Sequence, residues 1–343
     1  MFVHCLARWR NIGRDRSRRR SWLLRGFSTA DGAVSNVGDQ QFDFIFEGKE
    51  MASDPSGILV PAYDYPGEGD WDPLFAVAAY TRPGRLVVVA NPGDGPGYDP
   101  ETGSYREEDE NYVRAIARVT GVCGTVIGYV HDCYGDTNPP NANNCPRVTE
   151  IADDIARWFD IYKVDGIFID QTSATDQVRG EELISLVKGV KSDALVVLNA
   201  GTIPSLAFME ATDPAVVVVQ EQSFEHFESW PPPGWVRDRA NGDLSIPATR
   251  LAIIGHTPHN VEADVDLMVD VAREFHIGWV YANHANGSNY NALSTFLLPL
   301  GRRLCRLQSR FGLPCRIFTR PLCAASQLMK LVRSVTAFAR PGP

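Results

Sequence analysis

An eightfold alternation of strand-like and helix-like segments constrains the fold of this chain more than any other feature. Short apolar, β-branched runs are each followed by turn residues and then by a segment in which apolar residues recur three and four positions apart. Continuous apolar runs are typical of strands buried on both faces, and the longer period is typical of amphipathic helices. The expected strands are 58–63, 85–90, 125–130, 166–169, 195–198, 216–219, 251–254 and 279–282. The clearest expected helices are 111–120, 150–162, 181–190 and 261–275.

This α/β alternation predicts a parallel sheet covered by helices, and two arrangements would satisfy it. Eight repeats in about 240 residues match a single-domain (β/α)8 barrel, the TIM barrel fold. An open, doubly wound sheet is the alternative. No GxGxxG follows the first expected strand, where a dinucleotide-binding sheet would need it, and this favours the barrel.

Both ends of the chain differ in composition from its middle. Residues 1–30 contain eight Arg and one acidic residue, and residues 301–343 contain eight Arg, one Lys and no acidic residue. We therefore expect three parts: a basic leader over 1–50, the barrel over 51–300, and a basic, disordered tail over 301–343. The leader is either an organelle transit peptide or a mispredicted extension ahead of Met51, and it lacks the apolar stretch of a secretory signal. The localisation stays open between these readings.

The middle of the chain is strongly acidic. Residues 31–300 carry 16 basic and 41 acidic residues, a net charge of −25. Such a body repels phosphate backbones, so nucleic acid is excluded as an expected partner, and a neutral or cationic substrate is favoured. No run approaches the ~18 consecutive apolar residues of a membrane-spanning helix, so no membrane span is expected. The oligomeric state is not predicted.

Polar residues follow every expected strand, and in a barrel of this kind the carboxyl ends of the strands carry the chemistry. A ring of polar groups at the ends of apolar strands would be costly unless it faced a wet cleft. Ordinary turn formation is the alternative, and it accounts well for Asn91 and Asn199 but poorly for acidic residues. The polar residues are Asp64, Asn91, His131, Asp170, Asn199, Glu221, His256, Asn283 and His284.

Two of these residues form the candidate catalytic pair. Asp170 and Glu221 follow the most hydrophobic runs in the chain. Cleavage of a glycosidic bond needs two carboxyl groups, one protonated to donate to the leaving oxygen and one ionised to attack or to stabilise the transition state. Which of the two donates the proton stays open. The alternative is a structural ion pair with a basic residue such as Arg82 or Lys163.

Aromatic side chains are expected around this cleft, and they suit a carbohydrate because sugar rings present apolar CH faces to aromatic planes. Tyr63 and Tyr134 are the strongest candidates, and the wider set is Tyr65, Trp71, Tyr98, Tyr129, Phe224, Trp230 and Trp235.

A zinc hydrolase using His131, Asp132, His256, His259 and His284 is a weaker alternative, because the first strand lacks paired histidines. No metal and no organic cofactor is therefore expected. Cys133 and Cys145 bracket a loop and are either disulfide-bonded or free thiols.

Eight segments in register resemble the spherulin-4 family over about residues 57–298. They are ILVPAYDYPG, VVVANPGDGPG, VIGYVHDCYG, VDGIFID, ALVVLNAGT, EQSF, WPPPGWV and GWVYAN. The resemblance implies a (β/α)8 glycoside hydrolase similar to fungal endo-acting enzymes that cut α-1,4-linked N-acetylgalactosamine polymers. It also implies that Asp170 and Glu221 are the catalytic carboxylates. Relatives of this kind are often extracellular.

One position departs from the family pattern: Gln171 stands where the family usually has Glu. Two hypotheses follow. The first is an endo-acting hydrolase of amino-sugar polysaccharides that uses Asp170 and Glu221. The second is a catalytically silent polysaccharide-binding or cell-wall protein of the same fold, because Gln cannot exchange a proton. The expected substrate-binding residues are Tyr63, Asp64, Asn91, Tyr129, His131, Tyr134, Gln171, Asn199 and Asn283.

Overall fold

The computed structural model describes residues 20–22, 42–44, 57–67, 69–99, 101–135, 151–287 and 290–310. The chain divides into two units, Met1–Met51 and Ala52–Pro343. In the first unit, strands β1 (Arg20–Trp22) and β2 (Phe42–Phe44) pair antiparallel. Most of the expected leader lies outside the described residues.

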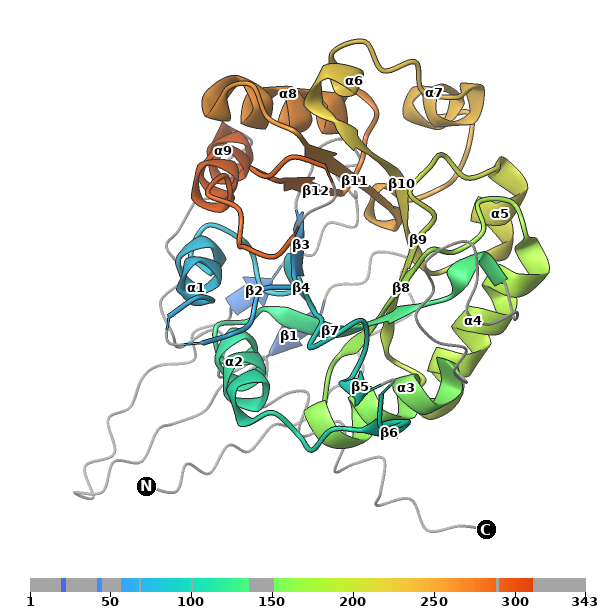
Figure 1. Cartoon of the computed structure of the whole chain (residues 1–343). Helices are drawn as coiled ribbons and strands as arrows, with labels where there is room; N and C mark the ends of the chain where they lie inside the picture. The colour runs from blue at the N-terminus through green and yellow to red at the C-terminus, as the bar shows by residue number, and fades with distance from the viewer. Residues whose placement is uncertain are drawn as a thin grey trace. The chain divides into compact units, whose positions relative to one another are not determined.

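The second unit is a closed barrel of eight parallel strands, which confirms the predicted fold (Figure 1). Each strand pairs with its neighbours in chain order, and the last closes on the first. The open-sheet alternative is therefore wrong. The strands are β3 (Gly57–Ala62), β4 (Leu86–Ala90), β7 (Thr125–His131), β8 (Gly166–Asp170), β9 (Leu195–Asn199), β10 (Val216–Ser223), β11 (Leu251–His256) and β12 (Trp279–Ala282).

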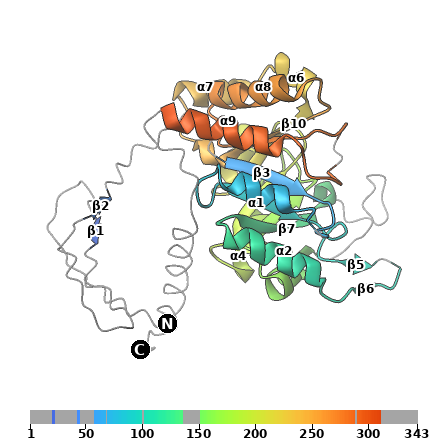
Figure 2. The same cartoon turned by 90° about the vertical axis from the view of Figure 1, so that its left-hand side faces the viewer.

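Helices surround the barrel and cover its outer face (Figures 1 and 2). Several begin at a side chain that caps the first turn: Asp109 accepts from the backbone N–H of Asn111, Asp176 from Arg179, and Asn260 from Glu262. The helices are α1 (Asp72–Ala78), α2 (Glu110–Gly121), α3 (Ile151–Arg157), α4 (Gln177–Val190), α5 (Leu206–Ala211), α6 (Phe224–Glu228), α7 (Gly234–Asn241), α8 (Val261–Glu274) and α9 (Leu297–Arg310). No described helix is long and apolar enough to cross a membrane.

Helix α9 continues past the expected boundary at residue 300. Leu300, Leu304 and Leu307 are buried, and the helix packs against α1 and α8 (Figure 2). Its apolar residues recur three and four positions apart, so the basic residues between them occupy the opposite face. The first ten residues of the expected tail thus belong to the barrel, and 311–343 lie outside the described residues.

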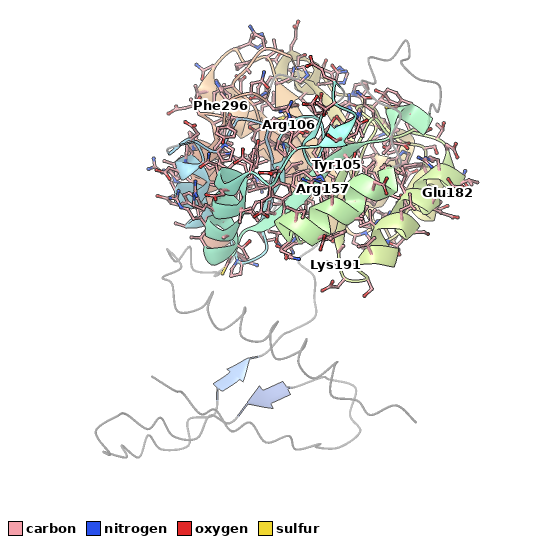
Figure 3. The ribbon with its side chains drawn as sticks, turned by 60° about the horizontal axis from the view of Figure 1, so that its bottom comes forward. Tyr105, Arg106, Arg157, Glu182, Lys191 and Phe296 are labelled. Carbon is pink, nitrogen blue, oxygen red and sulfur yellow. The ribbon has the colours of Figure 1, made fainter. Side chains whose placement is uncertain are left out.

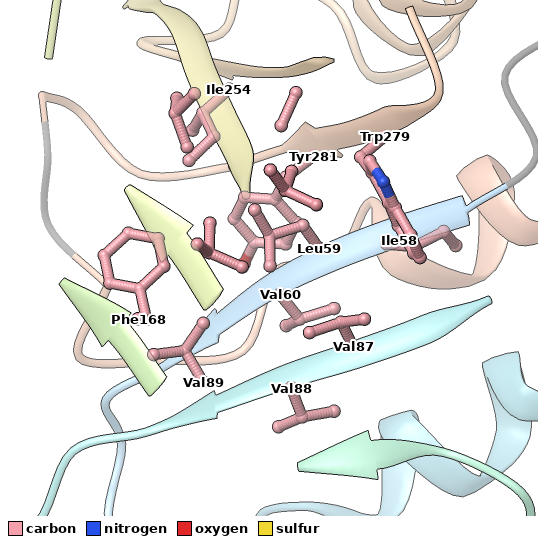
Figure 4. Close-up of a cluster of buried hydrophobic side chains, with 14 of the residues drawn as sticks. Ile58, Leu59, Val60, Val87, Val88, Val89, Phe168, Ile254, Trp279 and Tyr281 are labelled. Carbon is pink, nitrogen blue, oxygen red and sulfur yellow. The ribbon is translucent and has the colours of Figure 1, made fainter. Parts of the chain in front are cut away.

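The core consists of the apolar strand residues. Leu59, Val89 and Phe168 are almost completely buried on the inner face of the barrel, and Ile58, Val60 and Val88 are equally buried on the outer face of the same sheet, toward the helices (Figure 4). Such layers of branched side chains fill a barrel and hold its strands rigidly, because every strand is packed on both faces. This rigid frame fixes the positions of the side chains at the carboxyl ends of the strands.

A glycine in β7 brings that strand close to the helical layer. A Cβ atom at Gly128 would lie 2.2 Å from Trp158 Cδ2, so a larger residue would displace the indole. Trp158 starts a π-helical turn (Trp158–Tyr162) after α3, and its Nε1–H donates to the backbone carbonyl of Tyr129 at 2.8 Å. The contact fixes the end of β7, where Tyr129 reaches the site described below.

A two-stranded hairpin, β5 (Tyr98–Asp99) and β6 (Ser104–Tyr105), stands in the long connection between β4 and α2. The Tyr105 hydroxyl donates to Asp154 Oδ1 at 2.7 Å, and the guanidinium of Arg157 lies over the Tyr105 ring and donates to the Arg106 carbonyl (Figure 3). These contacts tie the hairpin to α3.

Candidate active site

A cavity of about 410 Å³ lies at the carboxyl ends of the barrel strands. Its walls come from β3, β8, β9, β10 and β11 and from the residues that follow them. The lining residues are Pro61, Tyr63, Tyr134, Phe168, Asp170, Gln171, Asn199, Gly201, Glu221, Gln222, Ile254, His256 and Tyr290. In the part of the chain that the structure describes, this lining contains two acidic residues and neither Lys nor Arg.

Asp170 ends β8 and points into this cavity. The Tyr129 hydroxyl donates to its Oδ2 at 3.0 Å, and the Asn199 amide donates to its Oδ1 at 2.9 Å. Burial raises the pKa of Asp170 to about 7, the charge of Glu221 adds to this rise, and the two hydrogen bonds oppose it. Asp170 is thus able to hold a proton at neutral pH, as a general acid must.

Glu221 reaches the same cavity from β10 through an irregularity of the strand. The pairing of β10 with β11 shifts between Val218 and Gln220, which is a β-bulge, and the strand continues to Ser223. Bulges near active sites change the direction in which the following side chains point. The Tyr290 hydroxyl donates to Glu221 Oε1 at 2.5 Å, and the Asn199 amide donates to Oε2 at 2.9 Å.

The two carboxylates are close neighbours. Because Asn199 Nδ2 lies 2.9 Å from one oxygen of each, these two oxygens are no more than about 6 Å apart. Carboxyl groups about 5 to 5.5 Å apart are typical of retaining glycosidases, and inverting enzymes have separations of about 6.5 to 9.5 Å. Within the described residues, neither carboxylate forms an ion pair with a basic side chain, and Lys163 pairs with Asp160 instead.

Three tyrosines that pack against one another lie beside the two carboxylates. The Tyr63 ring packs edge-to-face against Tyr129 at 5.3 Å and against Tyr290 at 5.5 Å. Burial raises the pKa of each of the three hydroxyls well above its ordinary value. All three therefore stay protonated at neutral pH, so Tyr129 and Tyr290 are permanent donors to Asp170 and Glu221.

Two loop residues with left-handed backbone conformations complete the wall. Tyr134 has φ 57° and Gln171 has φ 53°. The backbone N–H of Tyr134 donates to the Gln171 carbonyl at 2.6 Å, which joins the loops after β7 and β8. The Tyr134 ring is 51% exposed, and the buried Gln171 Oε1 has no hydrogen-bond partner among the described residues. Strained residues of this kind cluster at functional sites.

The structure brings six of the predicted residues to the cavity wall: Tyr63, Tyr134, Asp170, Gln171, Asn199 and Glu221. Tyr129 lies behind the wall and contacts Asp170.

Four predicted ligands, Asp64, Asn91, His131 and Asn283, do not line the cavity in the described part of the chain. Asn91 and Asn283 accept from backbone N–H groups of their own turns, at Gly95 and Ala285. Their binding of substrate stays a prediction.

Sequence reasoning missed Tyr290 and Gln222, and it named His256 as a residue after a strand and as a ligand of the alternative zinc site, but not as a sugar-binding residue. Tyr290 lies well beyond the end of β12, so reading the residues at strand ends does not reach it. Burial lowers the pKa of His256, so its ring is neutral near pH 7 and its Nδ1 shares a hydrogen bond with Thr257 at 2.9 Å. A neutral imidazole can accept or donate a hydrogen bond to a sugar hydroxyl.

Other predicted features have separate outcomes. Trp71, Phe224 and Trp230 are buried and pack in the helical layer, so they are not rim residues. No described group of three or more His, Cys, Asp or Glu is arranged to hold a metal ion. Cys133 is disulfide-bonded, and Cys145 lies outside the described residues, so their pairing stays a prediction.

Comparison with known proteins agrees with this fold. Residues 57–299 match the model of the spherulation-specific family 4. Spherulin-4 of Physarum polycephalum is 26% identical over 170 residues, which are 48% of this chain and 45% of that protein. The crystal structure of Aspergillus clavatus Sph3 in complex with GalNAc is 25% identical and superimposes with a TM-score of 0.55, covering 74% of this chain and 99% of that one.

Proposed function

Because the chain belongs to the spherulation-specific family 4, we propose that it is a glycoside hydrolase of amino-sugar polysaccharides, of the α-1,4-linked galactosamine or N-acetylgalactosamine type. The observation that carries the proposal is the pair of carboxylates, Asp170 and Glu221, joined by one amide in one cavity. The GalNAc bound to the similar Sph3 supports an amino sugar as ligand.

The proposed mechanism assigns different roles to the two carboxyl groups. Asp170, whose pKa is raised to about 7, donates its proton to the glycosidic oxygen as the bond breaks. Glu221 attacks the anomeric carbon and forms a glycosyl ester. Asp170 then takes a proton from water, which hydrolyses the ester and restores both groups. Tyr290 and Asn199 hold Glu221 in position for the attack.

Among the described residues, the cavity wall contains no Lys or Arg, and this supports a substrate that is neutral or cationic. Free amino groups of a partly deacetylated galactosamine polymer would be attracted by the Glu221 carboxylate and by the acidic body, and an anionic polymer would be repelled.

The test is product release by the full chain from α-1,4-linked galactosamine polymers with different degrees of acetylation. We expect short oligosaccharides whose new reducing ends first appear in the α configuration, as measured by proton NMR. Chitin, whose linkages are β, is the control and should stay intact. Products that first appear as the β anomer would contradict the retaining mechanism, and no release from any of these polymers would contradict the proposed function.

The second candidate function is polysaccharide binding without cleavage, and the observation in its favour is Gln171 in the cavity wall. If Asp170 and Glu221 supply all the acid and base groups that the reaction needs, a further carboxyl group in Gln171→Glu gives no advantage. We then expect the rate of this variant to stay within about tenfold of the native rate. A missing general acid or base costs about 10²- to 10⁴-fold. A gain of that size in Gln171→Glu, from a native chain that binds the polymer without cutting it, would establish the second function.

Tyr134 offers a test of sugar binding in either case. We expect Tyr134→Ala to weaken binding of a galactosamine oligosaccharide about two- to tenfold, because an aromatic contact contributes about 0.5 to 1.5 kcal/mol. The side chain is half exposed and lines the cavity, so its loss should leave the fold intact. Isothermal titration calorimetry measures the change. Tyr134→Phe keeps the ring and should bind like the native chain; equal weakening in both variants would exclude stacking.

A further inference from the structure

We propose that Asn199 is a positioning residue, whose single side-chain amide group holds Asp170 and Glu221 in one fixed arrangement as a pair. The role in catalysis rests on the proposed function. The geometric and electrostatic role does not, because it concerns the two carboxylates themselves.

The sheet order explains why an amide at this place reaches both acids. Strand β9 lies between β8 and β10 in the barrel, and Asn199 is its last residue. Asp170 ends β8 on one side, and Glu221 lies in β10 on the other. A side chain at the end of the middle strand is therefore placed between the two carboxylates. Its Nδ2 has two hydrogens and donates to each carboxylate at 2.9 Å.

A turn fixes which way the amide faces. Asn199 Oδ1 accepts from the backbone N–H of Gly201 at 2.9 Å, so the carbonyl side of the amide is occupied. A flipped amide would put N–H against N–H at Gly201 and an oxygen against two carboxylate oxygens, with the loss of three hydrogen bonds. The residue is also only 5% exposed, and its backbone carbonyl accepts from Thr172 N–H at 2.9 Å.

Asn91 provides an internal comparison because it lies at the corresponding end of another barrel strand, directly after β4. It is buried, and its Oδ1 also accepts from a backbone N–H of the following turn, that of Gly95, at 2.9 Å. In the described part of the chain, however, Asn91 makes no hydrogen bond to a carboxylate. Turn formation alone therefore explains why an Asn stands at position 91. It does not explain why the Asn199 amide N–H groups donate to two carboxylates.

The physical consequence is that Asn199 permits two acids to lie side by side. Like charges at this separation raise the affinity of the pair for a proton, and a shared donor offsets that effect by stabilising the ionised forms. Without the donor, Asp170 would hold its proton to higher pH, and Glu221 would lose one of its two hydrogen bonds. The amide thus sets both the geometry of the pair and the pH at which the pair loses its proton.

The test compares Asn199→Ser with Asn91→Ser in the full chain. Serine keeps an oxygen that can accept from the turn N–H, and it replaces the two hydrogens of the amide by a single hydroxyl hydrogen, which cannot donate to both carboxylates. The Asp170 carboxyl carbon is followed by ¹³C NMR titration and assigned by its loss in Asp170→Asn. We expect Asn199→Ser to raise the titration midpoint by about one pH unit or more, as loss of a charged hydrogen bond requires. Asn91→Ser should leave it unchanged.

An unchanged midpoint in Asn199→Ser, or an equal shift in Asn91→Ser, would overturn the proposal. If Asn199→Ser does not fold, Asn199→Asp keeps the shape and the turn acceptor, and it should raise the midpoint further. The titration needs no hydrolysis. If the chain cuts no polymer, the proposed function is contradicted, but the comparison of titration midpoints still tests the role of Asn199. In an active chain, Asn199→Ser should lower kcat with little change in KM. It should also shift the alkaline decline of the kcat–pH profile to higher pH.

Discussion

Asp170→Asn and Glu221→Gln are each expected to lower kcat/KM on a galactosamine polymer by about 10²- to 10⁴-fold or more, because each removes one half of the proposed acid and nucleophile pair. Both substitutions keep the size of the side chain and its place among Tyr129, Asn199 and Tyr290. Initial rates of reducing-end release measure the effect. The Gln222→Asn variant is the control: Gln222 lines the same cavity, and the change should cost less than tenfold.

The pH dependence distinguishes the two roles. The pKa of Asp170 is about 7, so the fraction that carries a proton falls as the pH rises through 7. If Asp170 is the acid, kcat/KM of the native chain declines on the alkaline side with a midpoint near that value, and the residual activity of Asp170→Asn lacks this limb. A rate that instead rises through pH 7 would make Asp170 the ionised partner and reverse the assignment.

The raised pKa of Asp170 also predicts how the free energy of unfolding of Asp170→Asn differs from that of the native chain, and measuring this difference shows that the variant is folded. A carboxyl whose pKa is raised by folding from 3.8 to about 7 stabilises the folded state below pH 4, and this contribution is lost as the pH rises to 7. Asp170→Asn removes the ionisation. It should therefore be more stable than the native chain at pH 8, on the order of 1 to 3 kcal/mol, and similar to it at pH 4. Denaturant unfolding at the two pH values checks this.

The barrel could be predicted because its signal is local and repeated. Each strand is a short apolar run, and helices such as α2 and α8 show a clear period of apolar residues with a cap at the first turn. Asp170 follows the same logic, since it directly ends an apolar strand. The last helix was missed because its basic face gave residues 301–310 the composition of a tail, although Leu304 and Leu307 are buried.

The details of the site depend on features that have no local signal. The bulge in β10 extends the strand to Ser223 and places Glu221 inside it, whereas the apolar run alone ends at Val219. Tyr290 reaches Glu221 from 69 residues further along the chain. Asn199 was predicted as a sugar ligand or as a turn residue, and its contacts with both carboxylates follow only from the order of β8, β9 and β10 around the barrel.

A second large effect is expected for the buried ion pair beside the site. The Asp132 side chain is fully buried, and the Nε and Nη2 groups of Arg179 both donate to its Oδ1, at 2.9 and 2.6 Å. This pair joins the start of α4 to the loop after β7. The backbone N–H of Asp132 donates to the Asp170 carbonyl at 2.9 Å, so the pair also supports the strand end that carries the proposed catalytic acid.

Arg179→Met is expected to lower the free energy of unfolding by about 3 kcal/mol at pH 7, because it leaves the buried Asp132 carboxylate without its counter-charge. Burial raises the pKa of Asp132 even with Arg179 present, so loss of Arg179 should raise it further. The carboxyl then takes up a proton more readily, and the stability difference should shrink at pH 5. Urea unfolding at both pH values measures it.

Arg114→Met is the matched control, since Arg114 pairs with Glu110 on an exposed helix face, where an ion pair contributes about 0 to 1 kcal/mol. Equal destabilisation by the two substitutions would show that the Arg179 pair has no special role. If the pair does support the end of β8, Arg179→Met should also lower the affinity for oligosaccharide at temperatures well below its Tm, whereas Arg114→Met should not. If Arg179→Met lowers the stability but leaves the affinity for oligosaccharide unchanged, the ion pair only stabilises the packing of α4 on the barrel and does not support the site.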